Sequence, residues 1–219
     1  MLNLLGANMR QSLRQPIKEL ELAAKLLDAA VDAFILKNYQ LADSLLVAAN
    51  FPEINEYAKS IVGKLSFDIH RQTKLPKRIP ISMRDPTRMP SQIEQNAIFL
   101  RDGWRCRFCG IKVISKKARA LLASSFKIET HWTSIASQRN SALYALASSL
   151  DHIDPHGRGG KNEQSNFVTA CYCCQFGRGD FTLAEVEVLN PLNRMPIIDD
   201  WDGLTRVLQL SPNTVSQVR

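Results

Sequence analysis

The first third of the chain has the hydrophobic spacing of amphipathic helices. From residue 15 to residue 38 apolar side chains recur every three or four positions, and Pro16 stands where the first residue of a helix would be. These apolar positions are Ile17, Leu20, Ala24, Leu27, Val31 and Phe34. The same spacing predicts shorter helices over residues 41–49 and 52–63. We therefore expect residues 1–69 to form a small helical module, which suits packing or a protein partner and offers no catalytic chemistry.

Residues 70–90 interrupt this pattern. They contain four prolines and six Lys or Arg, a composition typical of an extended, stiff connection rather than a helix or a central strand. Helical signals return at Ser91, which forms a capping box with Glu94 and should open a helix that ends near residue 102. We therefore expect a basic linker over residues 70–90 and a second domain over residues 91–219.

The second domain combines helices with a few short strands. Its residues 111–149 form an expected helical insertion between two groups of cysteines. The expected helices cover residues 116–125 (capped by Ser115), residues 137–149, a short segment after the capping box of Thr182 and Glu185, and a last segment from Asp202. Short strands are expected near residues 111–113, 150–153 and 167–169. The predicted fold class is therefore α+β, mostly helical.

The net charge of +7 is concentrated in one part of the chain. Residues 70–127 carry 14 Lys or Arg against 3 Asp or Glu. A segment this basic suits a polyanion, because neutralised phosphates release their counterions; a solvated basic surface is the alternative. The sequence has no apolar run of about 18 residues and no recognisable secretory signal. We therefore expect a cytosolic protein with no membrane partner.

All five cysteines fall into two clusters. A disulfide framework would scatter them, and a cytosolic compartment would keep them reduced. Cys106 with Cys109, and Cys171 with Cys174, have the CxxC spacing that presents two thiolates to one ion. Four sulfurs complete a tetrahedral shell, which predicts a structural Zn²⁺ site; a redox CxxC or buried thiols are the alternatives. Cys173 breaks the spacing, and we expect it to be a packing residue.

A second group of polar residues lies between the cysteine pairs. Asp151 can supply an oxygen ligand to a hard divalent cation, and His152 can act as a general base near neutral pH. The following proline, Gly-Arg-Gly-Gly turn and Lys161 suit a loop that lets a phosphate approach closely. Alone, an Asp-His pair is a weak signal, because such pairs are common on protein surfaces.

In this order the motifs resemble those of the HNH endonucleases, over roughly residues 95–180. They are similar in particular to bacterial HNH proteins with the patterns RDGxxCRFCG, DHxxPHxRGG, CxxC followed by Phe-Gly-Arg, and a final WDGL. In this chain the patterns stand at residues 101–110, 151–160, 171–178 and 201–204. The resemblance implies a ββα-metal core, in which two short antiparallel strands and a helix hold one catalytic divalent ion.

The resemblance also implies roles for single residues. Asp151 would be a ligand of the catalytic Mg²⁺ or Mn²⁺, His152 the general base that activates water, and Asn166 the residue that holds the loop and orients His152. After the second cysteine pair the family has His or Asn, whereas this chain has Gln175. The amide oxygen of Gln175 lies one methylene further out and remains a legitimate ligand for Mg²⁺ or Mn²⁺. His156 is the other candidate for this ligand position.

The implied activity is metal-dependent hydrolysis of DNA, in a role such as restriction or anti-phage defence. The expected phosphate contacts are Arg158, Lys161, Arg178, Lys74, Lys77 and Arg78. A zinc-organised DNA-binding or scaffold protein with a degenerate nuclease centre is the alternative, and Gln175 favours it. An RNase is a third class that nothing in the sequence excludes.

Overall fold

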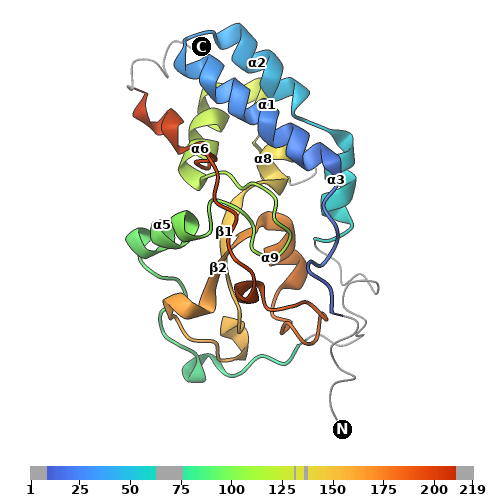
Figure 1. Cartoon of the computed structure of the whole chain (residues 1–219), viewed down its shortest axis with the longest axis vertical. Helices are drawn as coiled ribbons and strands as arrows, with labels where there is room; N and C mark the ends of the chain where they lie inside the picture. The colour runs from blue at the N-terminus through green and yellow to red at the C-terminus, as the bar shows by residue number, and fades with distance from the viewer. Residues whose placement is uncertain (1–8, 63–75, 131, 136–137, 211–219) are drawn as a thin grey trace.

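The computed structural model describes residues 9–62, 76–130, 132–135 and 138–210. Within these residues helices predominate and one small two-stranded sheet lies near the centre, so the α+β class is confirmed (Figure 1). None of the described helices is both long and apolar enough to cross a bilayer.

Three helices form the N-terminal part, as the hydrophobic spacing predicts. They are α1 (Lys18–Ile35), α2 (Tyr39–Ala48) and α3 (Pro52–Lys59). Helix α1 buries Leu20, Leu27 and Phe34 along one stripe and packs lengthwise on α2 (Figure 1). The predicted third helix ends earlier than expected, at Lys59 rather than near residue 63.

These helices share a core with the second half of the chain. They pack on α7 (Lys127–Thr130), on α8 (Ser141–Ala145) and on the 3₁₀ helix η6 (Thr205–Gln209). The ring of Phe34 meets the ring of Phe126 edge-on, with 5.0 Å between their centroids. The apolar side chains of both halves therefore belong to one continuous cluster.

Helices in the middle of the chain follow their predicted starts. The capping box of Ser91 opens α5 (Gln92–Arg101): the Ser91 hydroxyl accepts from the backbone N–H of Glu94, whose carboxylate accepts from the Ser91 N–H. Helix α6 (Lys116–Ser125) has the predicted bounds, although the Ser115 side chain makes no capping bond.

Other predicted elements are wrong. The helix expected over residues 137–149 is only the short α8, because the chain enters a strand at Ser148 and pairs there with a distant segment. Thr182 and Glu185 do make the two capping bonds, but turns follow instead of a helix. Asp202 opens a 3₁₀ helix, and residues 111–113 contribute an isolated bridge between Arg105 and Lys112.

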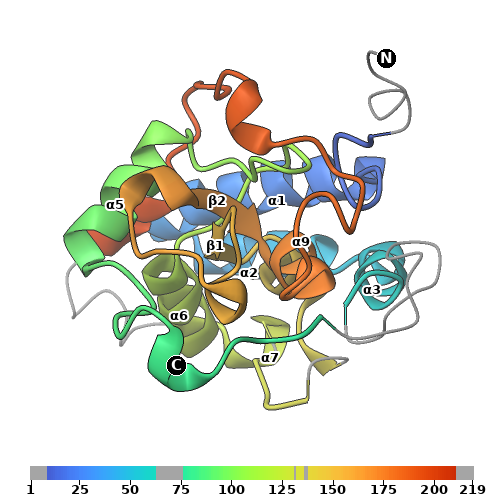
Figure 2. The ribbon, with the colours of Figure 1, turned by 90° about the horizontal axis from the view of Figure 1, so that it is seen from below.

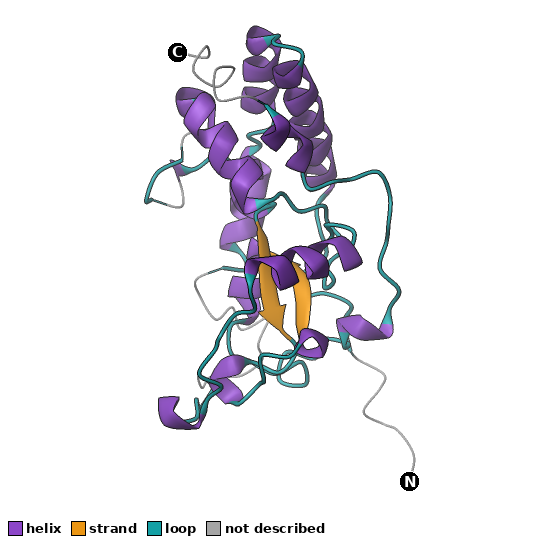
Figure 3. Cartoon of the chain, turned by 90° about the vertical axis from the view of Figure 1, so that its left-hand side faces the viewer, coloured by secondary structure: helices purple, strands orange, loops and turns teal. Residues whose placement is uncertain are grey.

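The sheet and the helix after it form the centre of the molecule. Strand β1 (Ser148–His152) runs antiparallel to β2 (Phe167–Cys171), with Asp151 opposite Val168 and His152 opposite Phe167. Helix α9 (Tyr172–Arg178) begins directly after β2 and packs on both strands. Figure 3 shows the two strands between the helical end of the molecule and an end made mostly of loops.

Residues 76–90 run along this loop end without an α-helix or a strand; they contain one 3₁₀ turn, η1 (Ile81–Met83), and several bends. Figure 2 shows the segment crossing the lower side of the molecule, in teal to green. We call residues 76–90 the strap. As predicted, this part of the linker forms neither an α-helix nor a central strand.

Candidate functional site

Four cysteines converge beside the start of α9. The Sγ atoms of Cys106, Cys109, Cys171 and Cys174 all lie within 4.8 Å of one another, and those of Cys109 and Cys171 are 3.8 Å apart. In each CxxC turn the backbone folds back, since Gly110 N donates to Cys106 O over 2.8 Å and Cys174 N lies 3.4 Å from Cys171 Sγ. This group could hold a metal ion.

Cys173 does not belong to this group. Its side chain is fully buried and carries a free thiol. Burial raises the pKa of this thiol well above its usual value, so it stays protonated near neutral pH. It fills the core as a small apolar residue, in line with its predicted role.

Backbone bonds bring the two cysteine pairs together. Arg107, in the middle of the first CxxC turn, donates its N–H to the carbonyl of Thr169 in β2 over 2.8 Å. The fully buried carboxylate of Asp102 accepts from Thr169 N over 2.7 Å and from the Arg101 side chain over 2.9 Å. The first pair is therefore tied to the strand that leads into the second pair. Asp102 was not among the predicted site residues, because sequence spacing alone does not single out a buried anchor.

A pocket of about 320 Å³ lies between β1, α9 and the strap. Asp151, His152 and Gln175 all line it, so the strand–strand–helix order brings these three predicted residues together. Among the described residues the Nε2 atom of His152 and the Oε1 atom of Gln175 are buried without a hydrogen-bond partner. A hydrogen bond orients the Gln175 amide: its Nε2 atom donates to Leu150 O over 3.0 Å. Both residues line the same pocket, and buried polar atoms usually have a hydrogen-bond partner in a folded protein.

The surroundings of His152 keep its imidazole neutral. Burial, and then electrostatic interactions with His156 and Arg88, lower its pKa to about 4. A hydrogen bond between the ring and the backbone of Arg88 opposes this shift. A hydrogen bond raises the pKa of an imidazole when the ring donates it, because the bond favours the protonated form. The Nε2 atom of His152 has no partner among the described residues. The bond to Arg88 therefore comes from Nδ1, which leaves Nε2 as the unprotonated nitrogen of the neutral ring.

Asp151 is held by Arg178 in a buried ion pair. The Nη2 and Nε atoms of Arg178 lie 2.8 and 3.0 Å from the two carboxylate oxygens. The remaining donors of the guanidinium bind the backbone carbonyls of Ile153, Phe181 and His152. Burial raises the pKa of Asp151, while Arg178 opposes the shift. A hydrogen bond from the backbone of His152 to the Asp151 carboxylate opposes the shift as well. The carboxylate therefore accepts bonds from two residues, and a metal ion would share it with them.

The expected phosphate contact by Arg178 is therefore wrong. Its side chain is only 1% exposed, and its donors are taken by Asp151 and by backbone carbonyls. A guanidinium enclosed in this way cannot reach a phosphate in solvent. The sequence pattern places a basic residue one turn after Gln175 but does not distinguish an inward from an outward direction.

Asn166 holds the loop between the two strands. Its amide oxygen accepts from Asp154 N over 2.8 Å, and its amide nitrogen donates to Asp154 O over 3.1 Å and to Lys161 O over 2.9 Å. The loop is closed so tightly at Gly160 that a Cβ atom there would lie 1.7 Å from Asp154 O. All three side-chain bonds of Asn166 go to loop backbone, so the His152 ring is oriented by the strap instead.

The strap is docked on this loop by a series of hydrogen bonds. Ile79 N donates to Gly157 O over 2.9 Å. The backbone carbonyl oxygen of Asp85 lies 2.8 Å from His156 Nε2, within hydrogen-bond distance. The Asp85 carboxylate also accepts from Asn162 N over 2.9 Å. His156 therefore faces the strap, and its ring centroid lies 5.8 Å from that of His152.

The docked strap brings arginines to the pocket. Arg78, Arg84 and Arg88 line one wall, and of these only Arg78 was among the predicted phosphate contacts. The sequence signal for the other two was the high share of basic residues in the linker, which does not say where each side chain lies.

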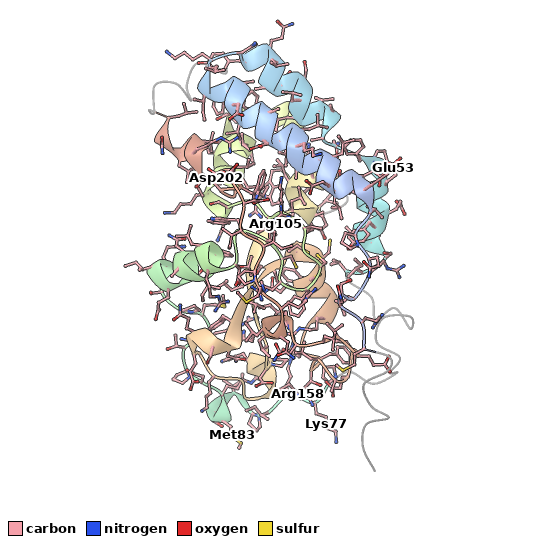
Figure 4. All side chains as sticks on the ribbon, viewed as in Figure 1. Glu53, Lys77, Met83, Arg105, Arg158 and Asp202 are labelled. Carbon is pink, nitrogen blue, oxygen red and sulfur yellow. The ribbon has the colours of Figure 1, made fainter. Side chains whose placement is uncertain are left out.

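The remaining predicted phosphate contacts are spread over the same end of the molecule. Lys77 is exposed, and Lys77 and Arg158 both lie at the end of the molecule opposite Glu53 (Figure 4). Arg158 pairs with Glu185 over 3.1 Å, and Lys161 lines an adjacent hollow with Arg158. Lys74 lies outside the described residues.

Comparison of the chain with protein-family models, with curated proteins and with solved structures found no match. Only the residues of the site and their geometry therefore bear on what the protein does.

Proposed function

We propose that the protein is a metal-dependent endonuclease of the HNH type that hydrolyses phosphodiester bonds in DNA. The observation that carries this proposal is the pair of unpartnered atoms, His152 Nε2 and Gln175 Oε1, on one pocket next to Asp151. A base nitrogen beside hard oxygen donors is the combination that metal-assisted hydrolysis needs. The β1–β2–α9 order agrees with the ββα arrangement that the motif resemblance implies.

The four cysteines fit a structural Zn²⁺ ion. Four sulfurs about 2.3 Å from a central zinc would lie about 3.8 Å apart. The distance of 3.8 Å between Cys109 Sγ and Cys171 Sγ agrees with that geometry. Such an ion would fix Cys171 and Cys174, and with them the first turn of α9, which carries Gln175.

Asp151 and Gln175 fit a catalytic Mg²⁺ or Mn²⁺, because both are oxygen donors and the Gln175 oxygen has no other partner among the described residues. When bound, this ion would stabilise the negative charge that develops on the leaving oxygen of the phosphodiester. Arg178 would keep the Asp151 carboxylate ionised and fixed in one orientation.

His152 would act as the general base. Its imidazole is neutral near pH 7, and its Nε2 lone pair is free to take a proton from the attacking water. The strap fixes the ring through its hydrogen bond with the Arg88 backbone. Asn166 keeps the following loop in place. The expected products carry 5′-phosphate and 3′-hydroxyl ends.

One observation favours a second candidate function, a zinc-organised DNA-binding or scaffold protein with a degenerate nuclease centre. Both oxygens of Asp151 are already bound by Arg178, and position 175 carries the longer glutamine. In that case the cysteine group and the basic end would remain useful, but the pocket would not hold a divalent ion.

A plasmid-nicking assay separates the two candidates. The wild type should convert supercoiled plasmid to open circles in the presence of Mg²⁺ or Mn²⁺, and His152→Ala should abolish conversion while DNA binding survives. Structured RNA in a parallel reaction tests the RNase alternative. Undiminished nicking by His152→Ala would refute the HNH mechanism, and binding without nicking by the wild type would favour the scaffold. A defence role and a protein partner for residues 1–69 remain predictions.

A further inference from the structure

The pocket has two walls of different chemistry. The strap contributes the arginines on one side, and α9 contributes the ring of Phe176 next to Gln175. Phosphate and a flat aromatic base are the two parts of a nucleotide that such walls can hold. The two walls therefore indicate whether the pocket takes a single strand or a duplex.

Phe176 is an exposed aromatic residue that lines the pocket. Its side chain is 53% exposed, although α9 is otherwise well packed. Its ring is backed by Tyr172, with 4.3 Å between centroids and an interplanar angle of 32°, and Tyr172 is backed in turn by Tyr144 at 4.3 Å. The ring of Phe176 is therefore supported from within the molecule and open toward the pocket, which is the form of a stacking platform.

The arginines of the strap are not equivalent. Arg78 is paired with Asp180, and Arg84 donates through Nε and Nη2 to Ile79 O. Arg88 is exposed, lines the pocket, and has no side-chain hydrogen bond or ion pair within the described residues. Its charge is close enough to lower the pKa of His152. Arg88 is therefore the guanidinium that is available to a phosphate beside the proposed base.

We infer that the pocket takes a nucleotide whose base is unstacked, with the base on Phe176 and a phosphate on Arg88. This inference rests on the proposed nuclease function and names its substrate class: single-stranded nucleic acid or an unpaired segment, rather than an intact duplex. A base inside a duplex is covered on both faces by its neighbours, and taking it out costs a few kcal/mol. A supported aromatic platform offers its stacking energy only to a base that is already free.

Binding measurements with the full-length His152→Ala protein test this without cleavage. The probes are fluorescein-labelled 12-nucleotide single strands of DNA and of RNA with one sequence, the matching DNA duplex, and a DNA strand of the same length made wholly of abasic sites. Adding Phe176→Ala should weaken binding of the normal single strand by about 5- to 150-fold, the range expected for losing one stacked base. Phe176→Trp should retain it, and Ile93→Ala, which removes an apolar side chain that is 83% exposed on α5, should change nothing.

The abasic strand is the decisive probe, because it keeps the phosphates and lacks the bases. Phe176→Ala should leave its affinity unchanged, whereas Arg88→Ala should lower the affinity of the abasic and the normal strand by the same factor. The RNA strand shows whether the 2′-hydroxyl matters at the site. An equal effect of Phe176→Ala on all probes, tighter binding of the duplex than of the single strand, or no binding of any probe would overturn the inference.

The proposed nuclease function is tested separately, by measuring cleavage with the protein that retains His152. Phe176-dependent binding without cleavage would refute the nuclease and leave the single-strand site standing. Cleavage of duplex DNA that does not depend on Phe176 would refute the single-strand site and leave the nuclease standing.

Discussion

Arg178 and Asp151 form a two-point ion pair in the interior, with Nη2 2.8 Å from Oδ1 and Nε 3.0 Å from Oδ2. Arg178→Met should lower the free energy of unfolding by about 3–5 kcal/mol, because it leaves a buried carboxylate without its counter-ion. Arg178→Lys should also destabilise, since an ammonium cannot repeat the two-point geometry. Urea denaturation at pH 7 measures both. The matched control is Arg158→Ala, whose more exposed pair with Glu185 should be worth about 1 kcal/mol or less. Equal losses in the two cases would contradict the structural role of Arg178.

Metal content provides the test of the cysteine group. Purified protein should hold about one zinc per chain, and Cys106→Ser or Cys171→Ser should lose both the metal and the folded state, because zinc binding contributes to folding. Cys173→Ser should keep the zinc, since Cys173 lies outside the group of four. Elemental analysis combined with circular dichroism distinguishes these results. If Cys173 proved essential and Cys174 dispensable, the ligand assignment would be wrong.

Gln175 should control the demand for the divalent ion. Gln175→Asn should retain substantial nicking activity or raise it, because it keeps an amide oxygen. Gln175→Ala should lower activity and shift the Mg²⁺ titration to higher concentrations, since water replaces one protein oxygen. Zinc content, measured on the same samples, should stay constant because the thiolates do not depend on the amide. An unchanged Mg²⁺ titration for Gln175→Ala would point to another ligand, such as His156.

The depressed pKa of His152 predicts a stability change at acid pH. Its folded-state pKa of about 4 lies below the value of about 6.5 for an unperturbed histidine. Between these two pH values the unfolded chain binds more protons, so the share of stability linked to His152 is complete above about pH 6.5 and is lost as the pH falls toward 4. Denaturation of wild type and His152→Asn at several pH values isolates this share. Parallel stability curves for the two proteins would show that the imidazole is not desolvated as the structure places it.

Lys77 should govern affinity rather than chemistry. It is exposed at the loop end of the molecule (Figure 4), so Lys77→Gln should weaken binding of all DNA sequences alike. Each lost phosphate contact should flatten the slope of log affinity against log salt by about 0.7–0.9. Lys59→Gln is the control, because Lys59 lies on α3 and pairs with Glu56. An unchanged salt slope for Lys77→Gln would mean that this end does not meet the nucleic acid.

Local signals predicted the elements that depend on neighbouring residues. The capping box of Ser91, the helix over residues 116–125 and the stripe of α1 need only a few adjacent positions, and all three are present. The helix expected over residues 137–149 failed because pairing of Ser148 with Cys171 is decided by a segment far along the chain. The strength of a local helical pattern cannot report such a distant partner.

In the candidate site, too, the sequence predicted the features that depend on local motifs and missed those that depend on distant contacts. The CxxC spacing identified the four cysteines that converge, and the Asp-His motif identified two residues of the pocket. Composition marked the linker as basic, but it could not show that residues 76–90 fold back over the loop or that Arg88 lies beside His152. The inward direction of Arg178 was missed for a related reason, because the partner that decides it, Asp151, comes from another element.

The docked strap also bears on how the protein is made. Synthesis delivers Arg88 early, but the loop that receives the strap and the helix that carries Gln175 leave the ribosome much later. A chain that stops before residue 180 lacks Asp180, the partner of Arg78, and a chain that stops before residue 171 also lacks half of the cysteine group. Prematurely terminated products would therefore hold strap arginines and one CxxC turn without a complete pocket. The proposed activity would therefore arise only after residues 150–180 have been synthesised and have received the strap.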